Sequence, residues 1–443
     1  MKRRLLASLM TLVMMLSMLP TAVWARETGS GGSQETEDTA KLKPQSGEEG
    51  TSRETATSKE LDLADGSIVI SARGYTQYKE SGNVSEDSDD GNYTIKQTDS
   101  TTATTNTITV TGGDHTITLN GVNIDVSGMS AGVPCAFAIE SGEVTLVLAD
   151  ESENTLKSGW INEDNADTGI SYAGLWVQEQ AQVVINGNTG KLAAVGGGSG
   201  SSELGNTSLA AGIGASRAHA SNKNDPWKSN VGTITIKGGV ITATGSAAGT
   251  YGGAGIGGGG GDWPGDNMGV NGSITITGGT VIAQGGPYGA GIGGGGWKNQ
   301  AGNNAGAQAS GNITISGGIV TATGGQYAPG IGSGAVSDHN GKTVHVLSGR
   351  MGEIVISGGS VTATNGSDFV AEGGKSYKTL DDGGVANVNT GIGQGVNASD
   401  DSQTAFEDWT LKDGNGETII EVEEFSSNSV TYTRNGGEQN RCR

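Results

Sequence analysis

Four segments of this chain repeat one pattern at nearly constant spacing. GTITIKGGVITATGS begins at Gly232, GSITITGGTVIAQGG at Gly272, GNITISGGIVTATGG at Gly311 and GEIVISGGSVTATNG at Gly352, in steps of 40, 39 and 41 residues. Each copy is followed by a short glycine-rich apolar piece, such as GAGIGGG or APGIGSG. A long fixed period with variable filler is typical of a repeat architecture, and it constrains the fold more than any other feature here.

One unit of the repeat predicts three short strands. Ile274 and Ile276 alternate with Thr275, which indicates a strand with one buried face. Glycine-rich corners separate this strand from two more, at 280–283 and 290–292. Stacking each unit on the last, about 4.8 Å away, builds a parallel β-helix in which like residues form ladders. We expect one internal ladder of Ile236, Ile276, Ile315 and Ile356, and another of Ile256, Ile292, Ile331 and Ile392.

We therefore predict an all-β fold, a single-stranded parallel β-helix (β-solenoid) of about seven coils with long loops. Residues 1–25 read as a signal peptide, with a basic start, an apolar middle and a small-residue cleavage site. Residues 26–60 are polar and charged and predict a disordered linker. The remaining ranges are a cap with first strands at 61–104, the repeats at 105–412, and a C-terminal cap and tail at 413–443.

Composition and charge limit the partners. Glycine makes up 80 of the 443 residues without an every-third-residue period, so the chain is not collagen-like. The net charge of −21 becomes −24 when the signal peptide is removed, which argues against nucleic acid as a partner. No later segment is long and apolar enough to span a membrane. We expect an extracellular protein, either secreted or associated with the cell wall.

Catalysis finds little support in the sequence, and we predict no catalytic residues and no enzyme. The four histidines are scattered, and the strands of 232–364 carry only Lys237 and Glu353 as charged residues, whereas a glycosidase needs two carboxylates at a set distance. The glycine runs lack the strand, helix and lysine context of nucleotide sites. No cofactor is required. Calcium held by loop carboxylates is an option, with Asp225, Asp262 and Asp266 as candidate ligands.

Aromatic residues recur once per unit, although they are only 5% of the chain. The tryptophans lie in predicted loops, and the tyrosines lie shortly before the glycine-rich third strand. Rows of flat rings beside polar side chains are suited to the faces of sugars, although each ring could instead pack on its own loop. The candidate carbohydrate-binding residues are Trp227, Trp263, Trp297, Tyr251, Tyr288 and Tyr327.

The alternating ITLNGVNIDVSG, the AFAIESGEVTLVLADESENTLKSG run, the AGLWVQEQAQVVING step and the ITITGGTVIAQGG–GAGIGGG units resemble a group of proteins in Gram-positive, clostridial and gut bacteria. These are secreted or cell-surface repeat proteins with carbohydrate-binding-type parallel β-helix domains. The resemblance covers about residues 65–425. It implies a parallel β-helix and carbohydrate binding, and a related clostridial family binds polygalacturonate on a calcium-containing β-helix. No contact residue of that family maps onto this chain.

Three functions remain open at this point. The leading hypothesis is non-catalytic extracellular binding of a polysaccharide or host glycan by a β-helix surface protein. The second is a structural stalk or adhesin that binds a host surface protein or serves as a spacer. The third is a pectin-type polysaccharide lyase or hydrolase.

Overall fold

The computed structural model describes the β-helix together with parts of its loops. The described residues are 58–87, 91–129, 132–162, 169–198, 210–218, 230–247, 252–260, 272–299, 311–326, 328–338, 353–364, 366, 392–393, 411–412, 418–420 and 429–433. The predicted signal peptide and residues 26–57 of the predicted linker lie outside them. Among the residues described, no helix has the length and apolarity needed to cross a membrane.

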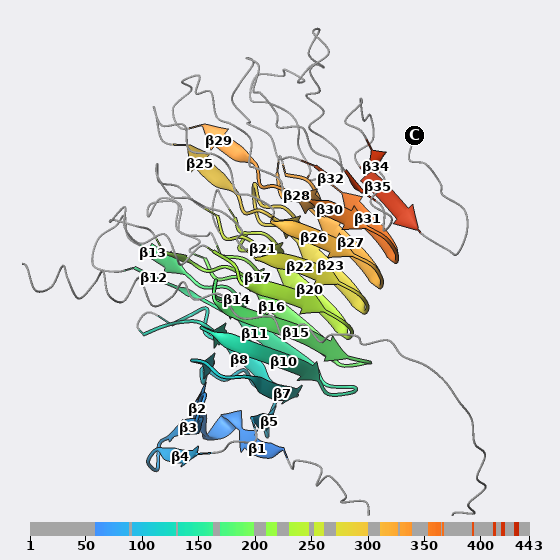
Figure 1. Cartoon of the computed structure of the whole chain (residues 1–443). Coiled ribbons are helices and arrows are strands. Elements are labelled where there is room, and N and C mark those ends of the chain that lie inside the picture. Colours follow the sequence, from blue (N-terminus) through green and yellow to red (C-terminus); the bar gives the residue numbers. More distant parts are fainter. Residues whose placement is uncertain are drawn as a thin grey trace, which may run out of the picture. The chain divides into compact units, whose positions relative to one another are not determined.

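Three long sheets form the walls of the β-helix (Figure 1). Sheet A contains, in order of pairing, β1 (Lys59–Asp62), β5 (Asn92–Lys96), β7 (His115–Asn120), β10 (Gly142–Leu148), β15 (Ala181–Gly187), β19 (Thr233–Ile236), β22 (Ser273–Ile276), β26 (Asn312–Ile315), β30 (Ile354–Ile356), β33 (Leu411–Lys412) and β34 (Thr418–Ile420). Sheet C contains β8 (Asn123–Asp125), β11 (Glu153–Lys157), β16 (Lys191–Val195), β20 (Val240–Thr244), β23 (Thr280–Gln284), β27 (Ile319–Thr323), β31 (Ser360–Thr364) and β35 (Ser429–Thr433).

Sheet B runs along the third wall. It contains β4 (Val84–Asp87), β3 (Gly74–Lys79), β2 (Gly66–Ser71), β6 (Ile108–Val110), β9 (Phe137–Ile139), β14 (Leu175–Val177), β17 (Ile213–Gly214), β21 (Ile256–Gly257), β24 (Ile292–Gly293), β28 (Ile331–Gly332) and β32 (Ile392–Gly393). The chain visits sheets A, C and B in turn, as in β22, β23 and β24. Between β7 and β32 the described residues contain seven such three-strand turns, which confirms the predicted parallel β-helix.

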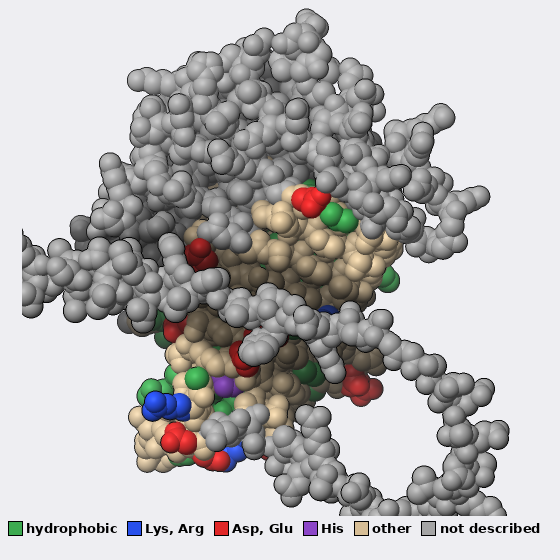
Figure 2. Space-filling model, in the orientation of Figure 1, with side chains coloured by type: hydrophobic (Ala, Val, Ile, Leu, Met, Phe, Trp, Pro, Cys, Tyr) green, Lys and Arg blue, Asp and Glu red, His purple; other side chains and the backbone are tan. Residues whose placement is uncertain are grey.

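Side chains alternate between the two faces of each wall. In β22, Ser273 and Thr275 are partly exposed, whereas Ile274 and Ile276 are fully buried. The outward positions of the later turns are mostly threonine and serine, so the described surface of these turns is largely uncharged (Figure 2). This is the pattern that the period of two predicts.

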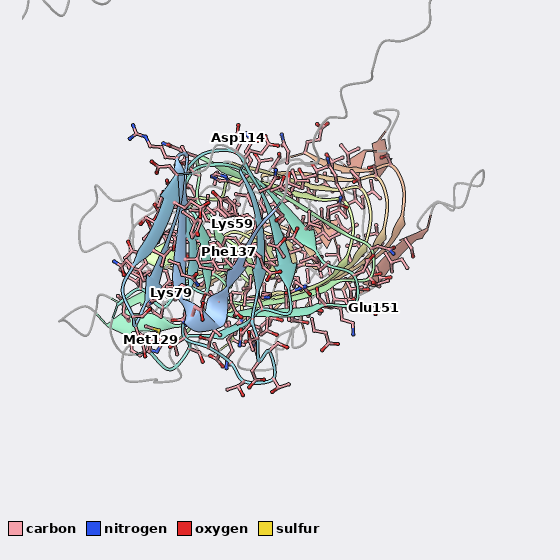
Figure 3. All side chains as sticks on the ribbon, turned by 90° about the horizontal axis from the view of Figure 1, so that it is seen from below. Lys59, Lys79, Asp114, Met129, Phe137 and Glu151 are labelled. Carbon is pink, nitrogen blue, oxygen red and sulfur yellow. The ribbon has the colours of Figure 1, made fainter. Side chains whose placement is uncertain are left out.

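The interior is filled by stacked aliphatic side chains. Ile236 pairs with Ile276, Ile276 with Ile315, and Ile315 with Ile356, so the first predicted ladder is confirmed. The second is confirmed by the pairs from Ile256 through Ile292 and Ile331 to Ile392. Seen along the turns from the N-terminal strands, Phe137 lies inside the ring of strands and Asp114 lies on its outer side (Figure 3). Burial of each such aliphatic side chain contributes about 1.5–3 kcal/mol.

The Gly-Ile-Gly strand of sheet B has a steric origin. A Cβ on Gly255 would lie 2.6 Å from the Gln284 backbone nitrogen in sheet C, because the two walls approach closely there. Gly257 has a φ of +128°, and a Cβ on it would overlap the carbonyl oxygen of Gly293 in the next turn. Both glycines are therefore required by the packing of backbone on backbone, and the glycine runs need no nucleotide to explain them.

Both ends of the stack differ from its middle. Parallel pairing begins at Lys59, since β1 pairs with β5, and β2 pairs with β6. This is earlier than the boundary at residue 105 suggested by the sequence, because Tyr93 and Ile95 of β5 extend the ladders of Ile117 and Leu119. A short 3-10 helix, η1 (Leu63–Asp65), connects β1 and β2. Antiparallel strands close the edges: β3 and β4 on sheet B, β34 on sheet A and β35 on sheet C.

Two small sheets lie outside the three walls. One is antiparallel and contains β12 (Trp160–Asn162), β13 (Gly169–Ser171) and β18 (Arg217–Ala218). The other pairs β25 (Trp297–Asn299) in parallel with β29 (Val336–Asp338). Segments inserted between walls therefore stack on one another in places, as the turns do.

Candidate functional site

Most residues predicted to bind sugar or calcium lie outside the described part of the chain. These residues are Trp227, Trp263, Tyr251, Tyr327, Asp225, Asp262 and Asp266. Their roles remain predictions.

The structure places the main chain of the other two predicted aromatic residues. Trp297 was expected in a loop, but it begins strand β25 and pairs with Val336 of the following unit. Tyr288 lies at a corner with a φ of +63°, and its side chain is partly buried. The Tyr288 amide donates to the Gln326 carbonyl (3.1 Å), and its carbonyl accepts from Ala335 (2.7 Å). The backbone of Tyr288 thus links successive turns.

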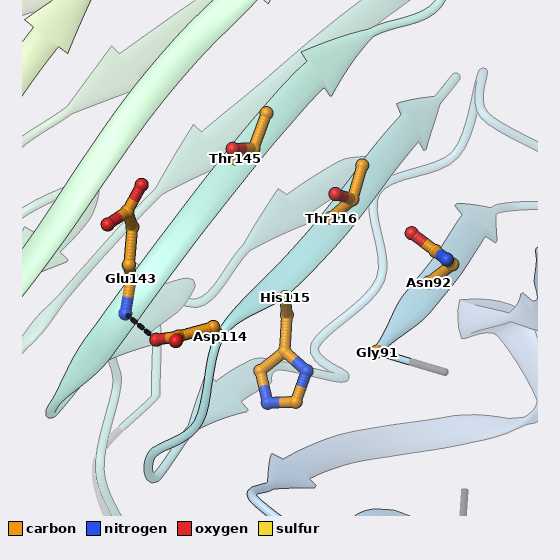
Figure 4. A pocket seen from close by; sticks show the side chains of 7 residues that line it. All are labelled: Gly91, Asn92, Asp114, His115, Thr116, Glu143 and Thr145. Atoms are coloured by element: carbon orange, nitrogen blue, oxygen red, sulfur yellow. Dashed lines mark hydrogen bonds between the residues drawn. The ribbon is translucent and has the colours of Figure 1, made fainter. Parts of the chain in front are cut away.

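A different set of residues forms a pocket on the early turns. The pocket has a volume of about 270 Å³ and is open to solvent. Its lining comes from the beginnings of three neighbouring strands of sheet A, β5, β7 and β10 (Figure 4). The lining residues are Gly91, Asn92, Asp114, His115, Thr116, Glu143 and Thr145.

The register of sheet A brings these residues together. Thr116 pairs with Asn92 on one side and with Thr145 on the other, so an amide and two hydroxyl groups share one outward row. In Figure 4 the two threonine side chains project side by side from adjacent strands. Strands in this register are about 4.8 Å apart, so the pocket offers hydrogen-bonding groups at regular short intervals.

Two carboxylates stand beside this row. The Asp114 carboxylate accepts a hydrogen bond from the Glu143 backbone amide (3.2 Å), which fixes the two residues next to each other on neighbouring turns. Both residues are exposed, and neither takes part in an ion pair in the described regions. The five ion pairs found there use Glu86, Asp65, Glu60, Asp125 and Glu153.

His115 is the buried member of the set. Its side chain belongs to a residue that is only 8% exposed, and its ring lies edge-on to Tyr93, with centroids 5.7 Å apart. Nε2 lies 3.0 Å from the Gly112 carbonyl oxygen, which can only accept, so Nε2 carries a proton. Nδ1 is buried and has no hydrogen-bond partner within the described residues. In the neutral ring, this nitrogen is therefore an unused acceptor.

The two outward rows continue along sheet A beyond the pocket. From Thr145 the first row runs through Val184, Thr235, Thr275, Thr314 and Val355. From Glu143 the second runs through Gln182, Thr233, Ser273, Asn312 and Glu353. At its far end the Asn312 side-chain oxygen accepts from the Glu353 amide (3.0 Å), which repeats the Asp114–Glu143 geometry with an uncharged partner.

The described residues provide neither a cluster of metal ligands nor a reactive thiol. No group of three or more His, Cys, Asp or Glu residues there is arranged to hold a metal ion. Cys135 is buried beside Tyr172 and Trp176, and burial raises the pKa of its thiol to about 12. Since the thiolate is the reactive form, Cys135 is unreactive at neutral pH. Cys442 lies outside the described residues.

The pocket was not predicted, because Asp114 and Glu143 lie outside the regular units, in which a charged pair was expected for a catalytic site. One signal was available: HTITL (115–119) and VTLVL (144–148) share the alternation of a stacked pair, and aligning them places Asp114 beside Glu143.

Comparisons with known proteins agree with this architecture. A family model described as a beta helix repeat matches residues 274–296, 313–335 and 354–374, which belong to the regular later turns. Neither the curated proteins nor the solved structures contain a significant match. The repeat match and the parallel sheets together show a parallel β-helix protein, and they leave the ligand open.

Proposed function

We propose that this chain is an extracellular, non-catalytic β-helix protein that binds a polysaccharide or glycan along the outer face of sheet A. The predicted signal peptide supports the location, and the resemblance to carbohydrate-binding β-helix proteins supports the ligand class.

The observation that carries the proposal is the pair of outward rows that begins at the pocket. Hydroxyl, amide and carboxylate groups recur on adjacent strands from Asn92 to Glu353. Hydrogen bonds to many hydroxyl groups are what an extended sugar chain requires, and a flat sheet presents such partners at a constant spacing. A pocket at one end of the rows suits one sugar unit, while the rows suit the units that follow.

A polysaccharide hydrolase is a second candidate, because Asp114 and Glu143 are two carboxylates fixed on neighbouring turns. A hydrolase needs two carboxyl groups on either side of the scissile bond. The stalk or adhesin hypothesis requires no ligand at sheet A.

Affinity electrophoresis of the full chain tests these functions. The gels would contain pectin, xylan, mannan, β-glucan, chitosan or mucin glycans, each with calcium or with a chelator. Retardation by at least one polymer is expected, and free migration through all of them would contradict carbohydrate binding. Release of reducing ends or unsaturated products from a retarding polymer would favour the enzyme instead.

A further inference from the structure

We infer that the pocket lined by Asp114, His115 and Glu143 selects a sugar unit that carries a free ammonium group, so that the ligand is a cationic amino-sugar polymer. The inference rests on the proposed function and specifies its substrate class.

The charge of the pocket is the first step. Asp114 and Glu143 present two carboxylates to one pocket, and no lysine or arginine in the described regions forms an ion pair with either. The lysines that form ion pairs in the described regions form them with acidic residues other than Asp114 and Glu143. Two adjacent like charges repel each other, so a bound cation would relieve this repulsion and gain charge-assisted hydrogen bonds.

The buried imidazole is the second step. A Cβ placed on Gly91 would lie 2.9 Å from the Asp114 carbonyl oxygen and 3.4 Å from His115 Nδ1, so the main chain at Gly91 covers this unused acceptor at the edge of the pocket. A buried acceptor without a partner costs about 1–3 kcal/mol. A ligand hydroxyl or ammonium donor that displaces the Gly91 main chain would recover this cost, so the site favours a ligand rich in hydrogen-bond donors.

The uncharged residues that line the pocket favour a sugar over a simple cation. Asn92, Thr116 and Thr145 add neutral groups that both donate and accept, which suits ring hydroxyls. A metal ion would need more anionic or imidazole ligands than the described residues bring together. A volume of about 270 Å³ has room for one sugar ring. The acidic chain, with a net charge of −21, also attracts a polycation over a longer range.

Isothermal titration calorimetry of the full chain tests the inference at about 0.15 M salt, where long-range attraction is screened beyond about 8 Å. The probes are a chitosan oligomer, the fully N-acetylated oligomer of the same length, and a neutral β-glucan oligomer. We expect the chitosan oligomer to bind at least tenfold more tightly than either. Asp114→Asn and Glu143→Gln should each weaken chitosan binding about tenfold, which corresponds to about 1.4 kcal/mol.

The chain supplies a matched control. Glu151→Gln removes the same charge from an exposed corner between β10 and β11, outside both rows and the pocket, and should leave chitosan binding unchanged. Asp114→Asn keeps the acceptor for the Glu143 amide, as Asn312 does for Glu353, so the variant should fold.

Each contrary result has its own meaning. Equal binding of the acetylated or neutral oligomer, or no effect of Glu143→Gln, would overturn the amino-sugar inference and leave carbohydrate binding in place. An oligolysine that binds as tightly as chitosan, with the same dependence on Glu143, would show recognition of charge without recognition of sugar and would also overturn it. Failure of every carbohydrate to bind, here and in the gels, would remove the proposed function itself.

Discussion

The early turns, from β5 to β16, and the later turns, from β19 to β31, share one interior but differ on their surface. Leu146 in the early turns and Ile276 in the later ones belong to the same continuous ladder. Outside, the early turns carry the pocket and the ion pairs Asp125–Lys157 and Glu153–Lys191, whereas the later turns present uncharged residues in the equivalent positions of sheet C, mostly threonine with serine, isoleucine, valine and glutamine.

This difference separates what specifies the fold from what specifies chemistry. The later turns are regular enough for a repeat family model to match them, because each unit places the same residue types at the same buried positions. The early turns keep the interior but vary the outward residues, and the described pocket lies there. Among the described residues, the candidate site therefore lies where the sequence departs from the regular repeat.

The largest expected effect concerns the glycines that only the backbone packing explains. Gly257→Ala should lower the free energy of unfolding by about 3 kcal/mol or more, because the new Cβ overlaps the Gly293 carbonyl oxygen and alanine disfavours a φ of +128°. Equilibrium urea unfolding measures this change. The outward Thr275→Ala is the control and should change stability by less than about 0.5 kcal/mol. If Gly257→Ala left the free energy of unfolding unchanged, the turns could not approach as closely as described.

A second prediction tests the shared interior of the two regions. Leu146→Ala and Ile276→Ala should each cost about 2–5 kcal/mol, since both side chains are fully buried in one ladder. Ile282, of the same residue type but 44% exposed on sheet C, should cost less than about 1 kcal/mol when changed to alanine. Thermal and urea unfolding of the three variants would show this order. A small effect for Leu146 alone would break the claim that both regions share one core.

How much of the fold and of the candidate site could be predicted from the sequence depends on the periodicity of each region. The isoleucine ladders followed from the sequence because a period of two and a constant unit length leave one register that buries Ile236, Ile276, Ile315 and Ile356 together. Asp114, His115 and Glu143 did not follow, because the turn from His115 to its partner Val144 spans 29 residues, whereas the turn from Ile234 to Ile274 spans 40. The burial of His115 also depends on Tyr93 beside it. Trp297 was misplaced because strand β25 forms by pairing with β29, which local sequence does not reveal.

The smallest expected effect concerns the ion pairs of the early turns. Burial alone would raise the pKa of Asp125, but hydrogen bonds from Ser127 (2.6 Å) and Lys157 (2.9 Å) outweigh it, so the folded pKa lies below the ordinary value of 3.8. A lowered folded pKa stabilises the fold above pH 3.8, and this contribution is lost as the pH falls through the folded pKa.

Asp125→Asn should therefore lower stability at pH 7 by about 0.5 kcal/mol, and the difference from the wild type should fade below about pH 3.8. Urea unfolding as a function of pH measures both. Thr323→Val, in the same outward row of the later turns, should show no such pH dependence. A difference between Asp125→Asn and the wild type that stays constant down to pH 2 would contradict the assignment.

The most direct test of where this protein binds sugar is hydrogen–deuterium exchange of the full chain with and without a saturating chitosan oligomer. Slower exchange in peptides that cover 91–96, 114–120 and 142–148 is the result expected from a site on the early turns. Slower exchange confined to the aromatic segments 225–229, 261–271 and 297–310 would contradict it and return the site to the regular repeats.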